Sequence, residues 1–478
     1  MVRRTKIVAT IGPRTSGAEE LRRLLLAGAD VARINFAHGD QDEHRAAIAM
    51  VREQAAALDR DVGILVDTPG PKMRTGPVEG DLIVLASGQS FTLTTDDRLG
   101  TRDACSTTVP DLPAMTAVGD EIFLADGAIV LSVAAIGRGK VETEVIRGGV
   151  LRSRKGMHIP RAERLVSAFT EEDEAALRTA VRLKVELVGL SFVRDAADLR
   201  RAKAALPKRG HRPLIVAKIE TRSAVENLQE IVREADAVMV ARGDLGIQLP
   251  LSEVPLLQKK IIAACNRAGR PVITATQMLE SMTRAPLPTR AEVADVANAV
   301  LDGTDALMLS EETAVGEFPQ ESVLKMAEIA ESAERGRAEM VDRRSQPLKA
   351  DMYDDSVSWS AAHAAVQAAA DLGVAAILCP TRSGSTPLRV AAFRPTMPIV
   401  ALSEVAATRG AVTLFWGVIP LKLEALHEGF TAEEDVARAT ETARRAGLVK
   451  RGDHVAVVAG TPGQRAGRTD YVRLVKVG

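Results

Sequence analysis

One lysine and two acidic residues gather in the stretch 214–246, which reads LIVAKIETRSAVENLQEIVREADAVMVARGDLG. Lys218 and Glu220 lie two residues apart at the end of a short β-favouring segment, so their side chains would share one face of a strand. Asp244 follows a second such segment, in a glycine-containing loop. Mg²⁺ is typically held by one or two protein carboxylates with water and phosphate oxygens, and a lysine supplies a compact charge for the same phosphate. These residue types indicate a metal-assisted phosphate site, the alternative being a strand-end salt bridge beside a turn aspartate.

A strand, a helix and a second strand would position these groups. Residues 214–220 and 237–240 favour strands, and between them apolar residues from Val225 to Val232 recur at helical spacing after Ser223, which we expect to cap the helix. So short a crossover makes the strands parallel and directs both C-terminal ends to the same side. The lysine and the two carboxylates would therefore converge.

The same alternation of strand and helix patterns recurs along the chain. Helical patterns such as 18–27, 42–58 and 292–301 follow strand-like segments at residues 6–10, 31–36, 63–67, 187–191, 214–219, 237–240, 271–275 and 306–309. Eight such units predict an α/β fold built on a (β/α)₈ TIM barrel.

In that fold the chemistry lies at the C-terminal ends of the strands. Charged or polar residues stand at this end of the predicted strands: Arg33, Asn35, Asp67, Arg194, Lys218, Glu220, Asp244, Thr276 and Ser310. Surface charge distributed at random would fall at both ends, so the one-sided placement indicates an active site.

Two boundaries divide the chain into three predicted domains. The connection 76–160, about 85 residues, is too long for a loop and alternates in DEIFLADGAIVLSV and KVETEVI, which predicts an inserted, β-barrel-like lid. After the polar stretch 343–355, strand patterns at 375–379, 399–402 and 455–458 alternate with helical patterns at 359–372 and 432–446. We expect a catalytic barrel over 1–75 and 161–342, the lid over 76–160, and a C-terminal α/β domain for regulation or oligomerisation over 343–478.

Composition excludes several classes of partner. The 478 residues carry a formal net charge of −1, which favours neither nucleic acid nor an anionic membrane. The three cysteines lack metal-ligand spacing and fit a reducing compartment, where we interpret them as structural. With no signal peptide and no apolar run of membrane length, we expect a cytoplasmic protein.

Several segments resemble the signature sequences of pyruvate kinase. These are AKIE at 217–220, MVARGDLG at 239–246, TQMLESM at 276–282, RINFAHG at 33–39, DTPGPKMRTG at 67–76 and the stretch 280–319, so the resemblance covers nearly the whole chain. It implies transfer of a phosphoryl group from phosphoenolpyruvate to ADP, giving pyruvate and ATP in glycolysis, with Mg²⁺ or Mn²⁺ as cofactor and a homotetramer as the assembly. Glu311 stands where the family usually has Gly, so the resemblance does not determine the conformation of the turn there.

The resemblance also implies roles for single residues at the barrel mouth. The matching catalytic lysine is Lys218, Glu220 and Asp244 match the metal ligands, and Thr276 matches the residue on the protonated side of the enolate, where it would orient a water. The backbone of Ala241, Arg242 and Gly243, next to Asp244, would receive the substrate carboxylate. Phe192 would be a wall of the pocket and Ser191 structural; Thr276 has the alternative of an ordinary strand-end threonine.

Phosphate and nucleotide binding are implied for a further set. Arg33 and Arg74 match phosphate-binding arginines of catalytic importance, a role that suits a guanidinium because it forms two parallel hydrogen bonds to phosphate oxygens. The alternative for each is a solvated arginine. Nucleotide binding is implied for Asn35, His38, Arg74 and Lys155.

The monovalent-cation site of the family is altered here. Family members commonly bind K⁺ through Asn, Ser, Asp and Thr, which match Asn35, Ala37, Asp67 and Thr68, so the serine oxygen is missing. Lys72 stands where K⁺-dependent members tend to have Glu and K⁺-independent members Lys. An ammonium replaces K⁺ as a fixed unit charge, so we expect activity without added K⁺. The alternative is a solvated Lys72 and a K⁺ held by three ligands and water.

A last candidate site lies in the C-terminal domain, where residues 381–386 read TRSGST between a strand pattern and a helix pattern. Backbone N–H groups, hydroxyls and a helix N-terminus suit an anion. Pyruvate kinases often bind a phosphorylated effector at the matching loop, here Thr381, Arg382, Ser383, Gly384, Ser385 and Thr386. A sugar bisphosphate, a sugar monophosphate, a nucleotide, an empty site and a plain helix cap remain open.

Two other functions compete with pyruvate kinase. A metal-dependent lyase or aldolase on the same barrel would share Glu220 and Asp244 without needing Arg74, Lys155 or the lid. A non-catalytic metabolite sensor using residues 381–386 would not need Lys218, Glu220 or Asp244.

Overall fold

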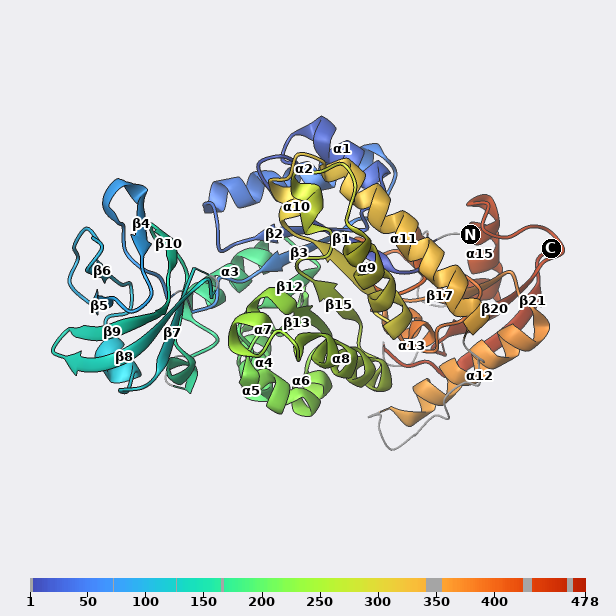
Figure 1. Ribbon diagram of the computed structural model, residues 1–478. Coiled ribbons are helices and arrows are strands. Elements are labelled where there is room, and N and C mark those ends of the chain that lie inside the picture. The colour runs from blue at the N-terminus through green and yellow to red at the C-terminus, as the bar shows by residue number, and fades with distance from the viewer. Residues whose placement is uncertain are drawn as a thin grey trace.

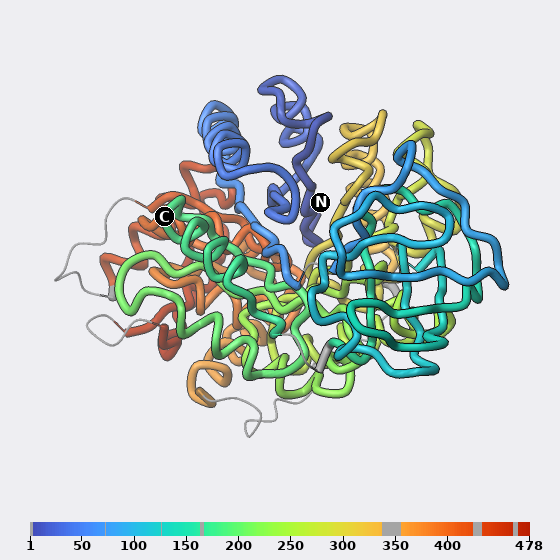
Figure 2. The backbone as a smooth tube through the Cα atoms, turned by 90° about the vertical axis from the view of Figure 1, so that its left-hand side faces the viewer, coloured from blue at the N-terminus to red at the C-terminus, as the bar shows by residue number. Residues whose placement is uncertain are grey.

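The computed structural model describes residues 3–71, 73–125, 127–164, 167–340, 355–423, 432–461 and 467–478. Three units follow one another along the long axis of the molecule: a β-rich insert, a central barrel and a C-terminal α/β domain (Figure 1). Figure 2 looks from the side of the insert, with the C-terminal domain behind. Lys72 and most of the predicted boundary stretch 343–355 lie outside the described residues.

The central unit is a closed barrel of eight parallel strands. The strands are β1 (Lys6–Thr10), β2 (Val31–Asn35), β3 (Gly63–Asp67), β12 (Leu187–Leu190), β13 (Leu214–Ile219), β14 (Ala237–Ala241), β15 (Val272–Ala275) and β16 (Ala306–Leu309). The predicted (β/α)₈ fold is confirmed, and four of the eight predicted strands have the observed bounds. The pattern was readable because both faces of each strand are buried, which gives short, nearly continuous apolar runs.

Helices surround the barrel. They are α1 (Ala18–Leu26), α2 (Gln41–Ala57), α3 (Glu171–Arg182), α4 (Ala196–Ala205), α5 (Arg222–Glu226), α6 (Leu228–Glu234), α7 (Arg242–Gln248), α8 (Val254–Ala268), α9 (Arg290–Asp302), α10 (Glu311–Ala314) and α11 (Pro319–Met340). Helices α2, α3 and α9 each begin with a capping box. In α9 the box is formed by Thr289 and Glu292, so the helix begins at Arg290, two residues before the predicted start. Glu311, in the position of a usual Gly, opens the short helix α10.

Two predictions around the helix after β13 were wrong. The cap is Thr221, whose hydroxyl accepts from Ala224 N, and not Ser223, because the helix begins at Arg222, ahead of the apolar residues whose spacing predicted it. The expected single helix is divided at Asn227 into α5 and α6. Asp244 also does not lie in a loop: the glycine-containing segment folds as α7, with Asp244 in its first turn.

Carboxylates cap the N-terminal end of the barrel in a fourfold pattern. Asp30, Glu186, Asp236 and Asp305 each stand directly before a strand, and each accepts the first or second N–H of the preceding strand in barrel order (2.8 to 3.0 Å). Their cationic partners are Arg3, Arg52, Lys203 and Arg394. Backbone donors that would be unsatisfied at this end are thereby paired.

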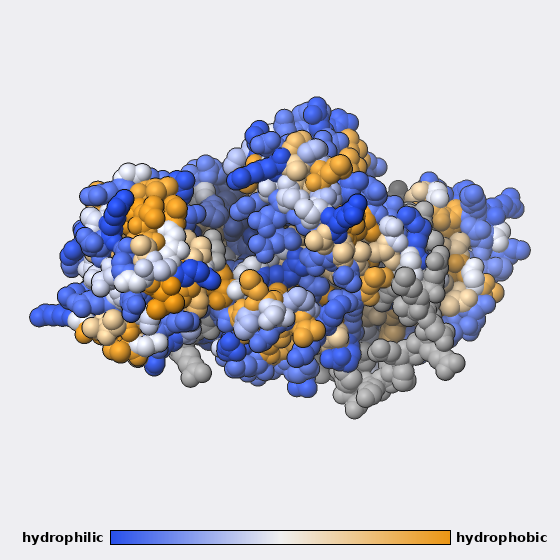
Figure 3. All heavy atoms as spheres, in the orientation of Figure 1, coloured by the Kyte–Doolittle hydropathy of each residue, from blue (hydrophilic) through white to orange (hydrophobic). Residues whose placement is uncertain are grey.

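The insert leaves the barrel after β3 and returns before α3. Its strands are β4 (Leu82–Leu85), β5 (Ser90–Thr94), β6 (Ala104–Ser106), β7 (Glu121–Leu124), β8 (Ile129–Gly137), β9 (Lys140–Arg147), β10 (Gly149–Arg152) and β11 (Met157–His158). They form a six-stranded and a two-stranded sheet around a separate apolar core. The predicted small β-domain is confirmed as part of the fold, and the surface is hollowed between it and the barrel (Figure 3).

The C-terminal domain consists of α12 (Ser356–Leu372), β17 (Ala376–Pro380), α13 (Ser385–Ala392), β18 (Ile399–Ser403), α14 (Ala406–Val412), β19 (Val418–Lys422), α15 (Ala432–Arg445), β20 (His454–Ala459) and β21 (Tyr471–Lys476). The sheet order is β19-β18-β17-β20-β21, with β21 antiparallel. β19 and β21 were not predicted. As expected for this fold class, the domain is separate and α/β.

The C-terminal domain packs on the capped end of the barrel. Lys6 Nζ donates to Val418 O (2.7 Å), and Arg394 contacts the cap residue Asp305 (2.7 Å). One apolar cluster includes residues of the barrel interior and of this domain. The insert and the C-terminal domain therefore contact opposite ends of the barrel. Among the described residues no helix is both long and apolar enough to span a bilayer, and the three cysteines are buried and unbridged.

Candidate active site

Four charged side chains form a buried cluster inside the mouth of the barrel. Arg33 on β2 donates from Nε and Nη2 to Asp67 Oδ2 on β3 (3.0 and 2.8 Å). Lys218 Nζ on β13 lies 3.2 Å from the same oxygen and 2.8 Å from Glu220 Oε1. The side chains of Asp67 and Glu220 are 1% exposed. Two cations and two carboxylates cancel in charge, which is the condition for burying ions without a large desolvation cost.

The cluster fits because β12 has no side chain at one position. Gly189 is paired in register with Asp67, and a Cβ at Gly189 would lie 2.3 Å from Asp67 Oδ1 and 3.5 Å from Lys218 Cδ. Any other residue would displace the carboxylate. Gly189 was not singled out from the sequence, because the clash depends on the register of β3 and β12.

The electrostatics keep both central groups charged. Burial by itself raises the pKa of Asp67, but the charges of Arg33 and Lys218 outweigh it, and the pKa lies below its usual value. Burial by itself lowers the pKa of Lys218, but Asp67 and Glu220 raise it above its usual value. Asp244 adds to this rise, so its carboxylate lies near enough to act on the ammonium. Lys218 is thus a fixed cation and cannot serve as a base at neutral pH.

Ser191, interpreted from the sequence as structural, contacts the ammonium directly. Lys218 Nζ donates to Ser191 Oγ (2.9 Å), which in turn donates to Thr68 O (2.8 Å). With Asp67 and Glu220, the hydroxyl gives the three ammonium protons an acceptor each. Thr10 plays a similar part for Arg33, whose Nη1 donates to Thr10 Oγ1 (3.0 Å).

The predicted monovalent-cation residues lie beside this cluster. Asp67 Oδ1 is buried and has no hydrogen-bond partner among the described residues. Thr68 is buried next to it, and Asn35 Oδ1 accepts from Ala37 N (3.1 Å). A buried carboxylate oxygen without a donor is suited to a cation.

The two predicted metal ligands end adjacent strands at the same mouth. Glu220 follows β13, and Asp244 lies in the first turn of α7, directly after β14; the two strands pair in parallel. Glu220 Oε2 accepts from Phe192 N (2.6 Å), and Phe192 holds a left-handed φ of 54° to make this contact. No group of three or more His, Cys, Asp or Glu in the described ranges could hold a metal by itself. Two carboxylates nevertheless fit Mg²⁺, which completes its shell with water and substrate oxygens.

Thr276 faces the first turn of α7. Its Oγ1 accepts from Gly243 N (2.8 Å) and donates to Ala275 O (2.6 Å), and its φ is 69°. A Cβ at Gly243 would approach only Thr276, at 3.6 to 3.8 Å, so glycine leaves space on this face. The side chain of Arg242 donates to the carbonyls of Ala275, Thr276 and Gln277.

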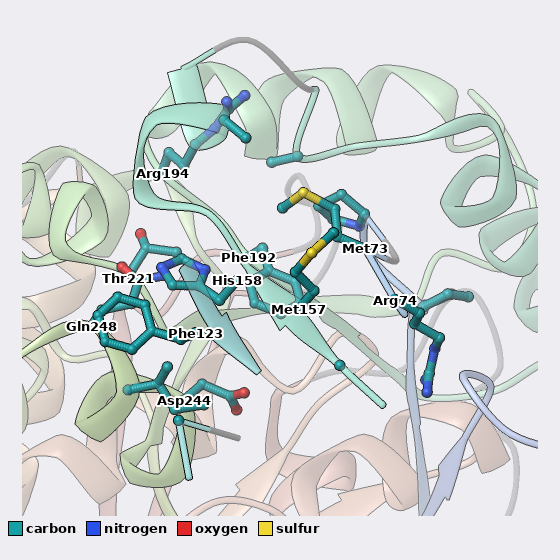
Figure 4. Close-up of a pocket in the computed structure, with 17 residues that line it drawn as sticks. Met73, Arg74, Phe123, Met157, His158, Phe192, Arg194, Thr221, Asp244 and Gln248 are labelled. Atoms are coloured by element: carbon teal, nitrogen blue, oxygen red, sulfur yellow. The ribbon is translucent and has the colours of Figure 1, made fainter. Parts of the chain in front are cut away.

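A pocket of about 170 Å³ lies between the mouth and the insert (Figure 4). The barrel contributes Phe192, Asp244 and Thr221, and the insert contributes Phe123, Met157 and His158. His158 is largely buried there, which lowers its pKa to about 4. The imidazole is neutral at physiological pH.

The predicted nucleotide residues divide between insert and barrel. Arg74 lines the pocket, and its Nη1 donates to Arg154 O (3.1 Å). Lys155 is exposed, and its backbone lies next to that of Arg74, because the following residue, Thr75, donates its N–H to Lys155 O (2.9 Å). His38 is exposed in the turn between β2 and α2. The structure thus brings the chain at Arg74 next to the chain at Lys155.

The loop Thr381–Thr386 lies in the other domain, before α13. Thr381 Oγ1 accepts from Gly384 N (3.0 Å), and Gly384 has a φ of 81°. The hydroxyls of Ser383 and Ser385 are 3.0 Å apart. Arg382 is exposed, and its Nη2 lies 3.5 Å from Glu404 Oε1. Thr386 Oγ1 forms a hydrogen bond with Thr469 Oγ1 (2.9 Å), which lies just before β21.

The ionisation of Asp67 should be required for stability. Asp67→Asn leaves Arg33 and Lys218 with one carboxylate fewer, so we expect the free energy of unfolding at pH 7 to fall by about 3 kcal/mol. Folding lowers the pKa of Asp67. The stability that its ionised carboxylate contributes is therefore complete above the pKa of the unfolded state, about 4, and is lost as the pH falls through the lower pKa of the folded state. Urea unfolding of the variant and the wild type from pH 7 to pH 3 should show that the difference between their free energies of unfolding becomes smaller as the pH falls.

Asp96→Asn is the matched control, because Asp96 pairs with Arg98 on the surface, where both side chains are more than half exposed. It should change stability by less than about 1 kcal/mol at every pH. Equal stability of Asp67→Asn and wild type at pH 7 would contradict the prediction.

Sequence comparisons agree with this geometry. The family model described as pyruvate kinase, barrel domain, matches residues 2–323, and that described as pyruvate kinase, alpha/beta domain, matches residues 360–475. A pyruvate kinase of Geobacillus stearothermophilus is 44% identical over 100% of this chain and 80% of its own length. Those of Thermococcus litoralis and Thermotoga maritima are each 39% identical, over 99% and 100% of this chain and 98% and 100% of their own lengths. The chain therefore belongs to the pyruvate kinase family of phosphotransferases.

Proposed function

We propose that this enzyme transfers the phosphoryl group of phosphoenolpyruvate to ADP and then protonates the resulting enolate to pyruvate. The observation that carries the proposal is the fixed ammonium of Lys218, held by three acceptors at the barrel mouth beside Arg33, Glu220 and Asp244. Family membership supports the substrates.

In the proposed reaction the bond between phosphorus and the enol oxygen breaks, the electron pair stays on that oxygen, and a β-phosphate oxygen of ADP bonds to phosphorus. Lys218 and Arg33 neutralise the charge of the migrating group. Glu220 and Asp244 would hold Mg²⁺ or Mn²⁺, which when bound neutralises further phosphate charge. Arg74 and Lys155 approach from the insert, together with Asn35 and His38 at the barrel rim, on the side proposed for the nucleotide.

The enolate then takes a proton at its methylene carbon, and its oxygen becomes the ketone of pyruvate. A hydroxyl is a weak acid, so Thr276 is proposed to orient a water that gives this proton. The backbone of Ala241, Arg242 and Gly243 holds the carboxylate, and Phe192 closes one side. The insert excludes water that would hydrolyse the phosphoryl group.

Replacing Lys218 by Met removes the fixed charge without removing the side-chain volume. We expect kcat to fall by about 10²–10³ and the KM for phosphoenolpyruvate to change little, because the charge acts mainly in the transition state. Coupled assay of pyruvate and ATP formation measures both constants. Lys259→Met, on an exposed helix position, is the control and should retain full activity. Full activity of Lys218→Met would remove this residue from the mechanism, and absence of ATP from the wild-type reaction would favour a lyase.

We also propose that the enzyme works without added K⁺, with Lys72 supplying the positive charge. Support comes from Ala37, which removes a ligand oxygen, and from Asp67 Oδ1, a buried acceptor without a donor in the described part of the chain. Asn35, Asp67 and Thr68, the other residues that match the family's cation site, are present in this chain.

The wild type should therefore keep its rate in K⁺-free buffer, while Lys72→Glu should require K⁺, which restores its rate by about tenfold or more. Steady-state rates in Tris buffer with and without KCl measure both. Lys208→Glu, elsewhere in the chain, controls for the change of charge. A wild type that loses about tenfold in rate without K⁺ and regains it with K⁺ would refute the proposal.

A phosphorylated metabolite is proposed to bind the loop Thr381–Thr386 as an effector. The hydroxyls of Ser383 and Ser385, exposed Arg382 and the start of α13 support an anion there. A homotetramer remains a prediction from the family resemblance, and a cytoplasmic location remains a prediction from the sequence features described above.

Titration with fructose 1,6-bisphosphate, ribose 5-phosphate, glucose 6-phosphate and AMP should identify one compound that lowers half-saturating phosphoenolpyruvate. Ser385→Glu should abolish that response with little effect on the basal rate, because its carboxylate repels the phosphate, while Ser385→Ala should respond more weakly than wild type. Steady-state kinetics measure the shift. A response that Ser385→Glu leaves intact would place the effector elsewhere.

A further inference from the structure

Arg242 makes an unusual set of contacts beneath the barrel mouth. Its side chain is 11% exposed, and Nε and Nη2 donate to three consecutive carbonyls, those of Ala275, Thr276 and Gln277 (2.6 to 3.3 Å). Nη1 is anchored by Asp295 Oδ2 (2.6 Å) and Gln258 Oε1 (3.2 Å). The guanidinium therefore connects α7 to the chain at the end of β15, and it is held in place by Gln258 of α8 and Asp295 of α9.

The backbone that it holds is strained. Thr276 and Gln277 have φ values of 69° and 52°, in the left-handed region that non-glycine residues rarely adopt. Such residues persist only where their surroundings determine them. Two successive left-handed residues turn the carbonyls to one side, and the fork of Arg242 is the donor group that pairs them.

The next residue of α7 fixes the side chain of the same threonine. Gly243 N donates to Thr276 Oγ1 (2.8 Å), and Oγ1 donates to Ala275 O (2.6 Å). Arg242 thus fixes the backbone of Thr276, and Gly243 fixes the direction of its hydroxyl. The acceptor Ala275 O is shared with Arg242, so both sets of contacts depend on one peptide plane.

We propose that Arg242 is a positioning residue for the protonation of the enolate, acting through Thr276. The inference rests on the role proposed above for Thr276 and adds a second residue to that step. Holding three carbonyls needs a planar fork of donors; a lysine at this position keeps the charge but presents a compact ammonium on a flexible stem. The rival explanation is that Arg242 only stabilises the fold through its ion pair with Asp295.

The test follows exchange of the methyl hydrogens of pyruvate with D₂O, by NMR, in the presence of Mg²⁺ and ATP. This reports the reverse of protonation: a proton leaves the methyl carbon, and its bonding pair forms the enolate. A displacement of about 1 Å can cost about 100-fold, so we expect Arg242→Lys to slow exchange by about that factor. The KM for phosphoenolpyruvate should change much less.

A double-mutant cycle separates the two explanations. In a Thr276→Ala background, Arg242→Lys should slow exchange no further, because the group that it positions is already absent. Asp295→Asn removes the ion pair but leaves the carbonyl contacts, and since Asp295 is 38% exposed we expect exchange within about twofold of wild type. A crystal structure of Arg242→Lys should show Thr276 and Gln277 relaxed from the left-handed region.

Opposite results would overturn the inference. The inference fails if Arg242→Lys slows exchange equally with and without the Thr276 hydroxyl. It also fails if Asp295→Asn loses exchange, or if the conformation of Thr276 is unchanged in Arg242→Lys. If Arg242→Lys fails to fold, Arg242→Gln, which keeps an amide donor, takes its place in the cycle. Failure of the proposed function is distinguishable, since the wild type would then form no ATP from phosphoenolpyruvate and ADP.

Discussion

The whole mouth of this barrel depends on burying two cations and two carboxylates in contact. Arg33, Asp67, Lys218 and Glu220 pair with one another from β2, β3 and the end of β13, and removing any one would leave an uncompensated buried charge. Gly189 makes the space for them, and the left-handed Phe192 brings an N–H to Glu220. The surrounding apolar layers favour folding, whereas the charge-balanced cluster fixes the positions of two cations at the barrel mouth.

The two ends of the barrel use carboxylates for different purposes. At the closed end Asp30, Glu186, Asp236 and Asp305 accept strand N–H groups, a stabilising role. At the open end Asp67 ends β3 and Glu220 follows β13, and both pair with Lys218, while Asp244 lies in the first turn of α7 after β14. This separation lets the C-terminal domain pack on the closed end, through Arg394 and Lys6, without covering the mouth.

Helix α14 is a physical link between the loop Thr381–Thr386 and the barrel. Thr408 Oγ1 donates to Arg382 O (2.6 Å), and the next residue, Arg409, pairs with Asp61 (3.0 Å) just before β3. Thr413, directly after the helix, accepts from Gly63 N (3.2 Å), the first residue of that strand. β3 ends at Asp67, so one strand joins the domain interface to the buried cluster.

The sequence by itself determined the alternation of strands and helices in the closed barrel, the insert, the C-terminal α/β domain and the end of the strands where polar residues gather. These follow from local periodicity and from the position of each residue along its own strand. Only the tertiary structure decided the space at Gly189, the contact of Ser191 with Lys218, the direction of the Arg242 side chain, the cap at Thr221 and the helical setting of Asp244. Each of these depends on strand register or on contacts between residues distant in the chain, which residue type and spacing do not specify.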